Sequence, residues 1–301
     1  MPKDFLQEKQ MTSFKYSDEN ISAPVAYSSL ETMHSVAEIV LPFYSEEKSR
    51  AIIEEIWART TEAEKKFNRF DKGSPLALVN KTAAEEAVAV DDEMFMVLEM
   101  CRVFCNSTDG YFDITANRIS RSASKGVKNF ELDADRHTVR FTDPTVKLDL
   151  GGFAKGYALE NACNILKQHN VTCALLNFGN SSIYASGSHP YGDYWPISVE
   201  HRYFRGRCAH TFELKDCALS ISGKNGRGVE HIIDPATGDL VMRDELVAVT
   251  GPSPMACEVL STALYVAPRE KRKDILARYK GYSASEIYCL TDGTTKVIKV
   301  Y

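Results

Sequence analysis

Short apolar runs separated by brief polar turns dominate the second half of the chain, and their spacing limits the folds open to it. Eight of these runs are predicted to be β-strands, at residues 173–178, 182–186, 195–200, 210–214, 218–222, 246–250, 286–290 and 295–300. Most of the intervening segments are long enough for a hairpin but too short for the crossover that parallel strands need. We therefore predict an α+β fold with mixed or antiparallel sheets flanked by helices, rather than a doubly wound parallel sheet.

Longer segments with helical periodicity supply the other layer. Ile52, Ile53 and Ile56 fall on one face of such a segment, with charged residues opposite. The predicted helices cover residues 45–66, 91–108, 154–169 and 254–266, and earlier strands cover residues 33–43, 137–141 and 146–150. Residues 67–80 are predicted to form a polar loop. We expect residues 1–25 to be a poorly ordered polar lead-in, followed by a single compact domain over residues 26–301.

Charge and cysteine usage exclude some classes of function. The formal net charge is −5, whereas a nucleic-acid-binding protein usually carries a basic patch. The eight cysteines include no CxxC pair and lie in apolar segments, which predicts buried reduced thiols rather than disulfides or a zinc site. The polar N-terminal residues and the lack of a long apolar run predict a cytoplasmic protein with no membrane insertion.

A glycine pair between a predicted strand and a predicted helix marks the first candidate site. Residues 149–156 read DLGGFAKG, so Gly151 and Gly152 let the backbone approach a ligand closely. The following helix start offers N–H groups to an anion. Lys155 in the first turn opposes the helix dipole, which is reasonable if it meets a phosphate. The alternative is an ordinary turn with a surface lysine.

A helix with oxygen-bearing side chains on one face gives the second candidate site. Glu258, Ser261 and Thr262 are spaced by three and four residues in an otherwise apolar segment. A carboxylate with hydroxyl groups is a hard-oxygen set suited to Mg²⁺. The alternative is a buried glutamate that the two hydroxyl groups satisfy, although an unpaired buried carboxylate is costly.

Two further segments are weaker indications on their own. His231 precedes the tight turn DPATG at residues 234–238, and most histidines in such apolar runs are core residues. Tyr111, Phe112 and Asp113 follow a glycine turn, where aromatic rings can enclose a planar ligand and a carboxylate can bind it. They are equally suited to packing at a helix end.

Taken together and in this order, these segments resemble those of the ApbE family, the FAD:protein FMN transferases. The matching strings are SPLALVN at 74–80, GYFDIT at 110–115, DLGGFAKGYALE at 149–160, SG…HIIDPATG at 222–238 and CEVLSTAL at 257–264. Trp195 resembles the tryptophan of a family strand, and Met33 lies where the family has a characteristic methionine. The resemblance extends from about Met33 to the C-terminus.

The resemblance implies an enzyme that moves the FMN half of FAD onto a threonine or serine hydroxyl of an acceptor flavoprotein, with release of AMP. It implies a two-lobed domain with the ligand in the cleft between the lobes. By position, the residues implied for FAD are Met33, Phe70, Tyr111, Phe112, Asp113, Asp149, Lys155 and Ile233. Those implied for Mg²⁺ are the Gly152 carbonyl, Glu258, Thr262 and Ser261. The implied catalytic residues are Lys155, Glu258 and His231.

The chain also departs from the family pattern at three positions. Glu258 replaces an aspartate, Ser181 replaces the aspartate of a GGD string, and Ile221 replaces the threonine of a TSG string. These changes leave two alternatives to an FMN transferase: a catalytically degenerate FAD-binding protein, and an FAD pyrophosphatase that yields FMN and AMP. A protein that binds no flavin is the remaining possibility.

Overall fold

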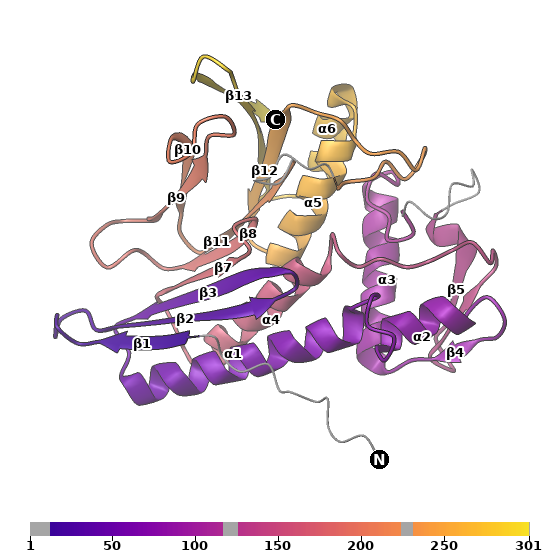
Figure 1. Ribbon diagram of the computed structural model, residues 1–301, viewed down its shortest axis with the longest axis horizontal. Helices are drawn as coiled ribbons and strands as arrows, with labels where there is room; N and C mark the ends of the chain where they lie inside the picture. Colours follow the sequence, from indigo (N-terminus) through magenta and orange to yellow (C-terminus); the bar gives the residue numbers. More distant parts are fainter. Residues whose placement is uncertain (1–12, 117–125, 224–230, 301) are drawn as a thin grey trace.

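A nine-stranded antiparallel sheet is the centre of the molecule (Figure 1). The computed structural model describes residues 13–116, 126–223 and 231–300. In sheet order, the strands are β1 (Ser13–Ser17), β2 (Val25–Thr32), β3 (Ser35–Pro42), β7 (Ala174–Phe178), β8 (Ser182–Ser186), β11 (Cys217–Ser222), β12 (Glu245–Gly251), β13 (Ser283–Cys289) and β14 (Thr295–Val300). Every neighbouring pair is antiparallel, which confirms the predicted α+β class.

Helices cover one face of this sheet. They are α1 (Glu46–Phe67), α4 (Ala154–Gln168), α5 (Pro254–Val266) and the short α6 (Arg269–Leu276). The apolar side of α1, with Ile52, Ile53 and Ile56, packs with α4 against β2, β3 and β7. The more apolar α5 packs against β11 and β12. Because α4 contacts both α1 and α5, the three form a continuous helical layer (Figure 1).

A smaller lobe stands beside the sheet, at the lower right of Figure 1. It contains α2 (Pro75–Thr82), α3 (Asp92–Ser107), the short helix η1 (Val127–Asn129) and a three-stranded sheet. The strands of that sheet are β4 (Val88–Ala89), β6 (Thr138–Phe141) and β5 (Phe130–Asp133). Its own apolar core is continuous with the first turns of α4 through Phe153 and Tyr157. The start of α4 therefore lies at the junction of the two lobes.

A two-stranded ribbon packs on the sheet face opposite the helices. It consists of β9 (Trp195–Glu200) and β10 (Cys208–Leu214), and we refer to it as the β9–β10 ribbon. Trp195 and Val199 are buried against Ala185, Ala248 and other side chains of that face. β10 packs beside β11, β13 and β14, so the ribbon covers only part of the sheet.

The structure differs from the sequence-based expectation in three segments. Residues 13–17 form the edge strand β1 instead of belonging to a disordered lead-in. This is because Phe14 and Tyr16 pack against the buried cluster that contains Ala26 and Leu30 of β2. The expected loop at 67–80 contains α2, with the Ser74 hydroxyl accepting a hydrogen bond from the Ala77 N–H. The expected strand at 146–150 is in none of the three sheets. The Asn80 side chain bonds both the Leu148 N–H and its carbonyl, in the place of a neighbouring strand.

An ion-pair cluster centred on Glu93 joins three helices. This carboxylate of α3 accepts hydrogen bonds from Arg59 and Lys66 of α1 and from the Tyr157 hydroxyl of α4. Although burial opposes ionisation, hydrogen bonds from Lys66, Tyr157 and Arg59 lower the pKa of Glu93. The ionised carboxylate therefore stabilises the fold above the unfolded-state pKa of about 4.3, and this contribution is lost as the pH falls through the lowered folded-state value.

Glu93→Gln is expected to reduce the free energy of unfolding near neutral pH by about 1–3 kcal/mol, because it weakens a partly buried network of charged groups. Urea unfolding of both proteins at neutral pH and below pH about 4 would measure the difference. The deficit should shrink in acid. A deficit of the same size at both pH values would contradict the role assigned to the Glu93 charge.

Two remaining expectations concern the cysteines and the membrane. All eight cysteines are free thiols, as predicted, but Cys208 is exposed and Cys217 is half-buried, contrary to the expected burial. Burial raises the pKa of Cys105 to about 12. Among the described residues, no helix combines the length and apolar character needed to cross a bilayer.

Candidate active site

A large cavity lies between the two lobes, and the predicted site residues gather in it. Its volume is about 1760 Å³. The small lobe contributes Tyr111, Phe112 and Asp113, and the sheet and its helices contribute Lys155, Glu258 and Thr262. Of all the residues predicted for FAD, metal or catalysis, only Ser261 is not part of the lining. The cavity also continues beyond the predicted site, under the β9–β10 ribbon.

The DLGGFAKG segment forms the turn into α4, at the floor of the cavity. The Asp149 carboxylate accepts a hydrogen bond of 2.9 Å from the Gly151 N–H and lies 3.0 Å from the Arg69 guanidinium. The Lys155 side chain extends from the first turn of α4 toward the sheet. Its ammonium group donates to the Ser181 hydroxyl and lies 3.3 Å from Glu258 Oε1. The helix start and Lys155 together bring N–H donors and an ammonium group to this part of the cavity, beside the Asp149 and Glu258 carboxylates.

Gly156 allows α4 to approach α5 closely. A Cβ atom at this position would lie 2.7 Å from Glu258 Cβ and 2.9 Å from Met255 Cα, closer than real contacts allow. The absence of a side chain therefore sets how far Lys155 and Glu258 stand apart.

Gly156→Ala is expected to reduce the free energy of unfolding by about 1–3 kcal/mol through overpacking, and to displace Lys155 from Glu258. Gly192→Ala is the matched control, because a Cβ there would meet nothing closer than 3.9 Å. Thermal unfolding and FAD affinity of both variants would be measured. Equal behaviour of the two variants would show that the α4–α5 contact has no such role.

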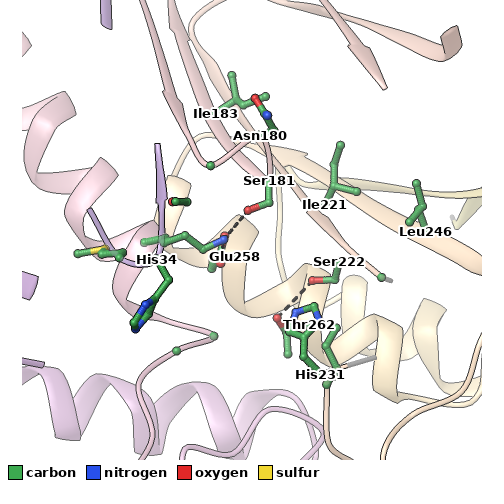
Figure 2. Close-up of a pocket in the computed structure, with 18 of the residues that line it drawn as sticks. His34, Asn180, Ser181, Ile183, Ile221, Ser222, His231, Leu246, Glu258 and Thr262 are labelled. Atoms are coloured by element: carbon green, nitrogen blue, oxygen red, sulfur yellow. Dashed lines mark hydrogen bonds and ion pairs between the residues drawn. The ribbon is translucent and has the colours of Figure 1, made fainter. Parts of the chain in front are cut away.

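The Glu258 carboxylate is buried and bound by hydroxyl groups as well as by Lys155. Ser182 of β8 and Ser220 of β11 both donate to Glu258 Oε2, the latter at 2.9 Å. Figure 2 shows Glu258 near the centre of the site, with Ser181 above it and Thr262 below it to the right. A buried charge with a cationic partner and two donors is satisfied without water. The longer glutamate side chain thus spans the distance from α5 to the serines of the sheet.

Hard oxygen atoms lie beside this carboxylate. Thr262 Oγ1 is 3.3 Å from the Ser222 hydroxyl, and a Cβ placed on Gly152 would be 3.7 Å from Thr262 Oγ1. Among the described residues, no group of three or more His, Cys, Asp or Glu side chains gathers to hold a metal. A cation here would therefore depend on the Gly152 backbone, the Thr262 hydroxyl and the single carboxylate. That donor chemistry fits Mg²⁺, which keeps several waters and leans on substrate phosphates.

Ser261 lies behind the cavity lining. It is fully buried, and its hydroxyl forms hydrogen bonds with Ser220 at 3.0 Å and Ser222 at 2.9 Å. It also donates to the Glu258 carbonyl at 3.1 Å. In this structure Ser261 therefore holds Ser220 and Ser222 in position and does not itself contact the cavity.

Aromatic side chains and a buried carboxyl group line the small-lobe end of the cavity. Phe70 is 68% exposed and meets His34 edge to face, with ring centroids 6.1 Å apart. Burial raises the pKa of the Asp113 carboxyl, although the Thr115 N–H and hydroxyl both donate to it at 2.8 Å. Exposed rings beside a polar buried group suit a planar ligand with hydrogen-bonding edges.

Met33 and His231 also line this cavity. Met33 lies in the turn between β2 and β3 with φ of 48°, and its N–H donates to Glu64 at 2.9 Å. His231 and Ile233 follow residues outside the described part of the chain. They line the cavity near Thr262, as Figure 2 shows for His231. Ile233 is fixed by an isolated bridge to Leu240.

Sequence reasoning missed the hydroxyl groups around Glu258 and the guanidinium beside Asp149. The sequence marks Ser181 only as the residue that replaces the aspartate of the family's GGD string. Ser182 follows it directly. Ser220 precedes Ser222 by two residues, so the strand period already places both on one face. Arg69 precedes Phe70, and only the fold shows that it reaches Asp149.

The comparison of sequences gives the family. Residues 33–285 match the ApbE family. The chain belongs to this family. Its relatives include an FAD:protein FMN transferase from Treponema pallidum, which is 25% identical over 281 residues, covering 79% of this chain and 77% of that protein. An FAD:protein FMN transferase from Haemophilus influenzae is 24% identical over 257 residues, or 74% of each chain.

Solved structures confirm the ApbE-like fold. The flavin transferase ApbE from Vibrio cholerae has a TM-score of 0.79 at 22% identity, covering 92% of this chain and 97% of that one. The ApbE protein from Thermotoga maritima has a TM-score of 0.75 at 24% identity, covering 94% and 96%. The resemblance seen in the sequence motifs is therefore confirmed at the level of family and fold.

Proposed function

We propose that this ApbE-family protein transfers the FMN half of FAD onto a threonine or serine hydroxyl of an acceptor flavoprotein and releases AMP. Homology to FAD:protein FMN transferases supports a transferase. The observation that carries the proposal is the position of Lys155. Its ammonium group lies at a helix start, beside Glu258 and Ser181, in a cavity with ample space for a dinucleotide.

In this proposal, different residues of the cavity bind different parts of FAD. The small-lobe end, with Tyr111, Phe112 and Asp113, would hold the flavin ring, with Met33, Phe70 and Ile233 nearby. Asp149 would fix the turn that presents the N–H groups of α4. Lys155 would bind the pyrophosphate, because a flexible ammonium group is suited to phosphate charge.

Mg²⁺ would be held by the Gly152 carbonyl, the Thr262 hydroxyl and Glu258, with Ser261 behind them, and when bound would withdraw charge from the pyrophosphate. This chain's own residues do the remaining work. Glu258 keeps Lys155 extended into the cavity, and the serine hydroxyls keep Glu258 in place. Both groups are thus fixed before the substrate arrives, which favours electrostatic stabilisation of the transition state.

The reaction is a substitution at phosphorus. The acceptor oxygen forms a bond to the FMN phosphorus, and the bond from that phosphorus to the oxygen of AMP breaks. The AMP phosphate leaves with the electron pair of the broken bond, and Lys155 balances the developing negative charge. The proton of the acceptor hydroxyl would pass to His231, which lines the cavity beside Thr262.

Incubation of the protein with FAD, Mg²⁺ and candidate acceptor flavoproteins tests the proposal. We expect AMP in solution and covalent flavin on one threonine or serine of an acceptor, both lost when the metal is chelated. Free FMN without an acceptor would instead indicate the FAD pyrophosphatase. Bound FAD with no AMP under any condition would indicate a flavin-binding protein and refute transfer.

A further inference from the structure

The cavity extends beyond the residues assigned to FAD. Ligand pockets commonly have volumes of about 300–1,000 Å³, whereas this cavity has about 1760 Å³. Beyond Ser181, it continues along the inner side of β9, from Pro196 to His201. This second part, which we call the β9 groove, begins where the proposed transfer chemistry takes place.

The floor of the β9 groove is apolar. Leu175, Ile221 and Leu246, from β7, β11 and β12, are only partly buried by the cluster that holds the β9–β10 ribbon on the sheet. All three line the cavity. In Figure 2, Ile183, Ile221 and Leu246 lie on one side of Ser181 and Ser222, and His231 and Thr262 lie on the other. The apolar floor of the β9 groove is therefore continuous with the part of the cavity where the transfer is proposed to occur.

One wall of the β9 groove is the edge of a strand. In the described part of the chain, β9 pairs with β10 alone. Its second edge therefore offers backbone N–H and C=O groups for pairing with another extended chain. Pro196 lacks an N–H group, so this edge is usable over Ile197–Glu200. A flavin ring has no backbone-like repeat that matches such an edge.

The far end of the β9 groove carries two arginines beside Glu200, whose carboxylate accepts a hydrogen bond from the Gly206 N–H. Arg202 and Arg205 follow β9 in the turn to β10, and both line the cavity. Arg205 is exposed, whereas Arg202 lies 3.6 Å from the Asp244 carboxylate. Because Arg202 already has a carboxylate partner, an occupant with an acidic side chain at this end would complement Arg205.

We infer that the β9 groove binds an extended segment of the acceptor protein, which adds as a third strand to the β9–β10 ribbon and places an acidic side chain near Arg205. This inference rests on the proposed transfer function. Alternate side chains of the segment would contact the apolar floor, since strand side chains alternate between faces. The acceptor hydroxyl would then enter at Ser181, beside Lys155.

Two synthetic peptides test the inference without any turnover. Both place a threonine among β-branched residues, and one ends in aspartates while the other ends in lysines. We expect the acidic peptide to bind the full-length protein roughly 10-fold more tightly, as measured by fluorescence anisotropy. Hydrogen exchange should show slower exchange of the Ile197–Glu200 amides when it is bound. Equal binding of both peptides, no binding, or protection only at other elements would overturn the inference.

Matched substitutions separate docking from FAD binding. Arg205→Glu should abolish the preference for the acidic peptide and leave FAD affinity unchanged. Arg207→Glu is the control, because this exposed residue of the same turn does not line the cavity. Loss of FAD affinity in Arg205→Glu alone would assign the arginine to the dinucleotide and overturn the inference. Peptide binding at β9 without AMP release would refute only the transfer function.

Discussion

Lys155→Met is expected to lower the rate of AMP release at saturating FAD by about 100-fold or more, since losing one preorganised donor commonly has an effect of that size. The ammonium group has no substitute on α4, and the neighbouring Glu258 would then repel the pyrophosphate. Methionine keeps the length and the apolar stem of lysine, so packing along α4 should change little, although the buried Glu258 carboxylate loses its cationic partner. Steady-state assays with FAD, Mg²⁺ and an acceptor would measure the effect.

Lys167→Met is the matched control for this variant. It removes the same charge from the same helix, but at an exposed position in the last turn, away from the cavity. Its rate should remain within about 2-fold of the wild type, because exposed surface charges contribute little. A normal rate for Lys155→Met, with the metal still required, would remove Lys155 from the proposed reaction. Thermal unfolding of each variant would exclude loss of folding as the cause.

Arg272→Leu is expected to reduce the free energy of unfolding by about 3–5 kcal/mol, the usual cost of removing one partner from a buried ion pair. Arg272 is fully buried in α6 and bridges two strands of the large sheet. Its guanidinium group lies 2.9 Å from Glu245 Oε1 of β12 and 2.5 Å from Glu286 Oε1 of β13. Without it, two carboxylates would remain close together with little access to water. Urea unfolding monitored by far-ultraviolet circular dichroism measures the loss.

Arg269→Leu provides the comparison for this prediction. Arg269 also pairs with Glu286, but its side chain is 55% exposed, and exposed pairs contribute about 0–1 kcal/mol. Combining Arg272→Leu with Glu245→Gln and Glu286→Gln should recover part of the lost stability, because two buried carboxylates left only with the partly exposed Arg243 and Arg269 would no longer carry charge. Similar losses for the two arginine variants would show that burial of Arg272 does not determine its contribution.

The sequence predicted the elements that have a long periodic pattern of apolar residues. It missed segments whose hydrogen bonds come from residues far away in the chain. The long helix α1 and the hairpin of β13 and β14 have clear patterns. The sequence around Ser74 and Pro75 does contain a helix-start signal, but the polar residues before it favoured a loop. The backbone at Leu148 is extended, and only the fold shows that Asn80, far away in the sequence, completes its hydrogen bonds.

The sequence motifs predicted which residues belong to the candidate site, but not how their side chains are arranged around one another. The order of the motifs gave the family, which the comparison confirmed. The serines that surround Glu258 come from β8 and β11, and their meeting depends on strand pairing that a single sequence does not encode. The apolar floor under β9 also could not be predicted, because its residues come from three separate strands.

The burial of α5 links ligand binding to the global unfolding of the protein. Glu258 and Thr262 project from a helix whose other side lies in the core with Leu260 and Leu264. The site therefore cannot lose its order while the core remains intact, and a ligand that binds it selectively stabilises the whole native state. The melting temperature should consequently rise with ligand concentration, even in variants that have lost turnover. For this protein, occupancy of the site can be read by calorimetry independently of catalysis.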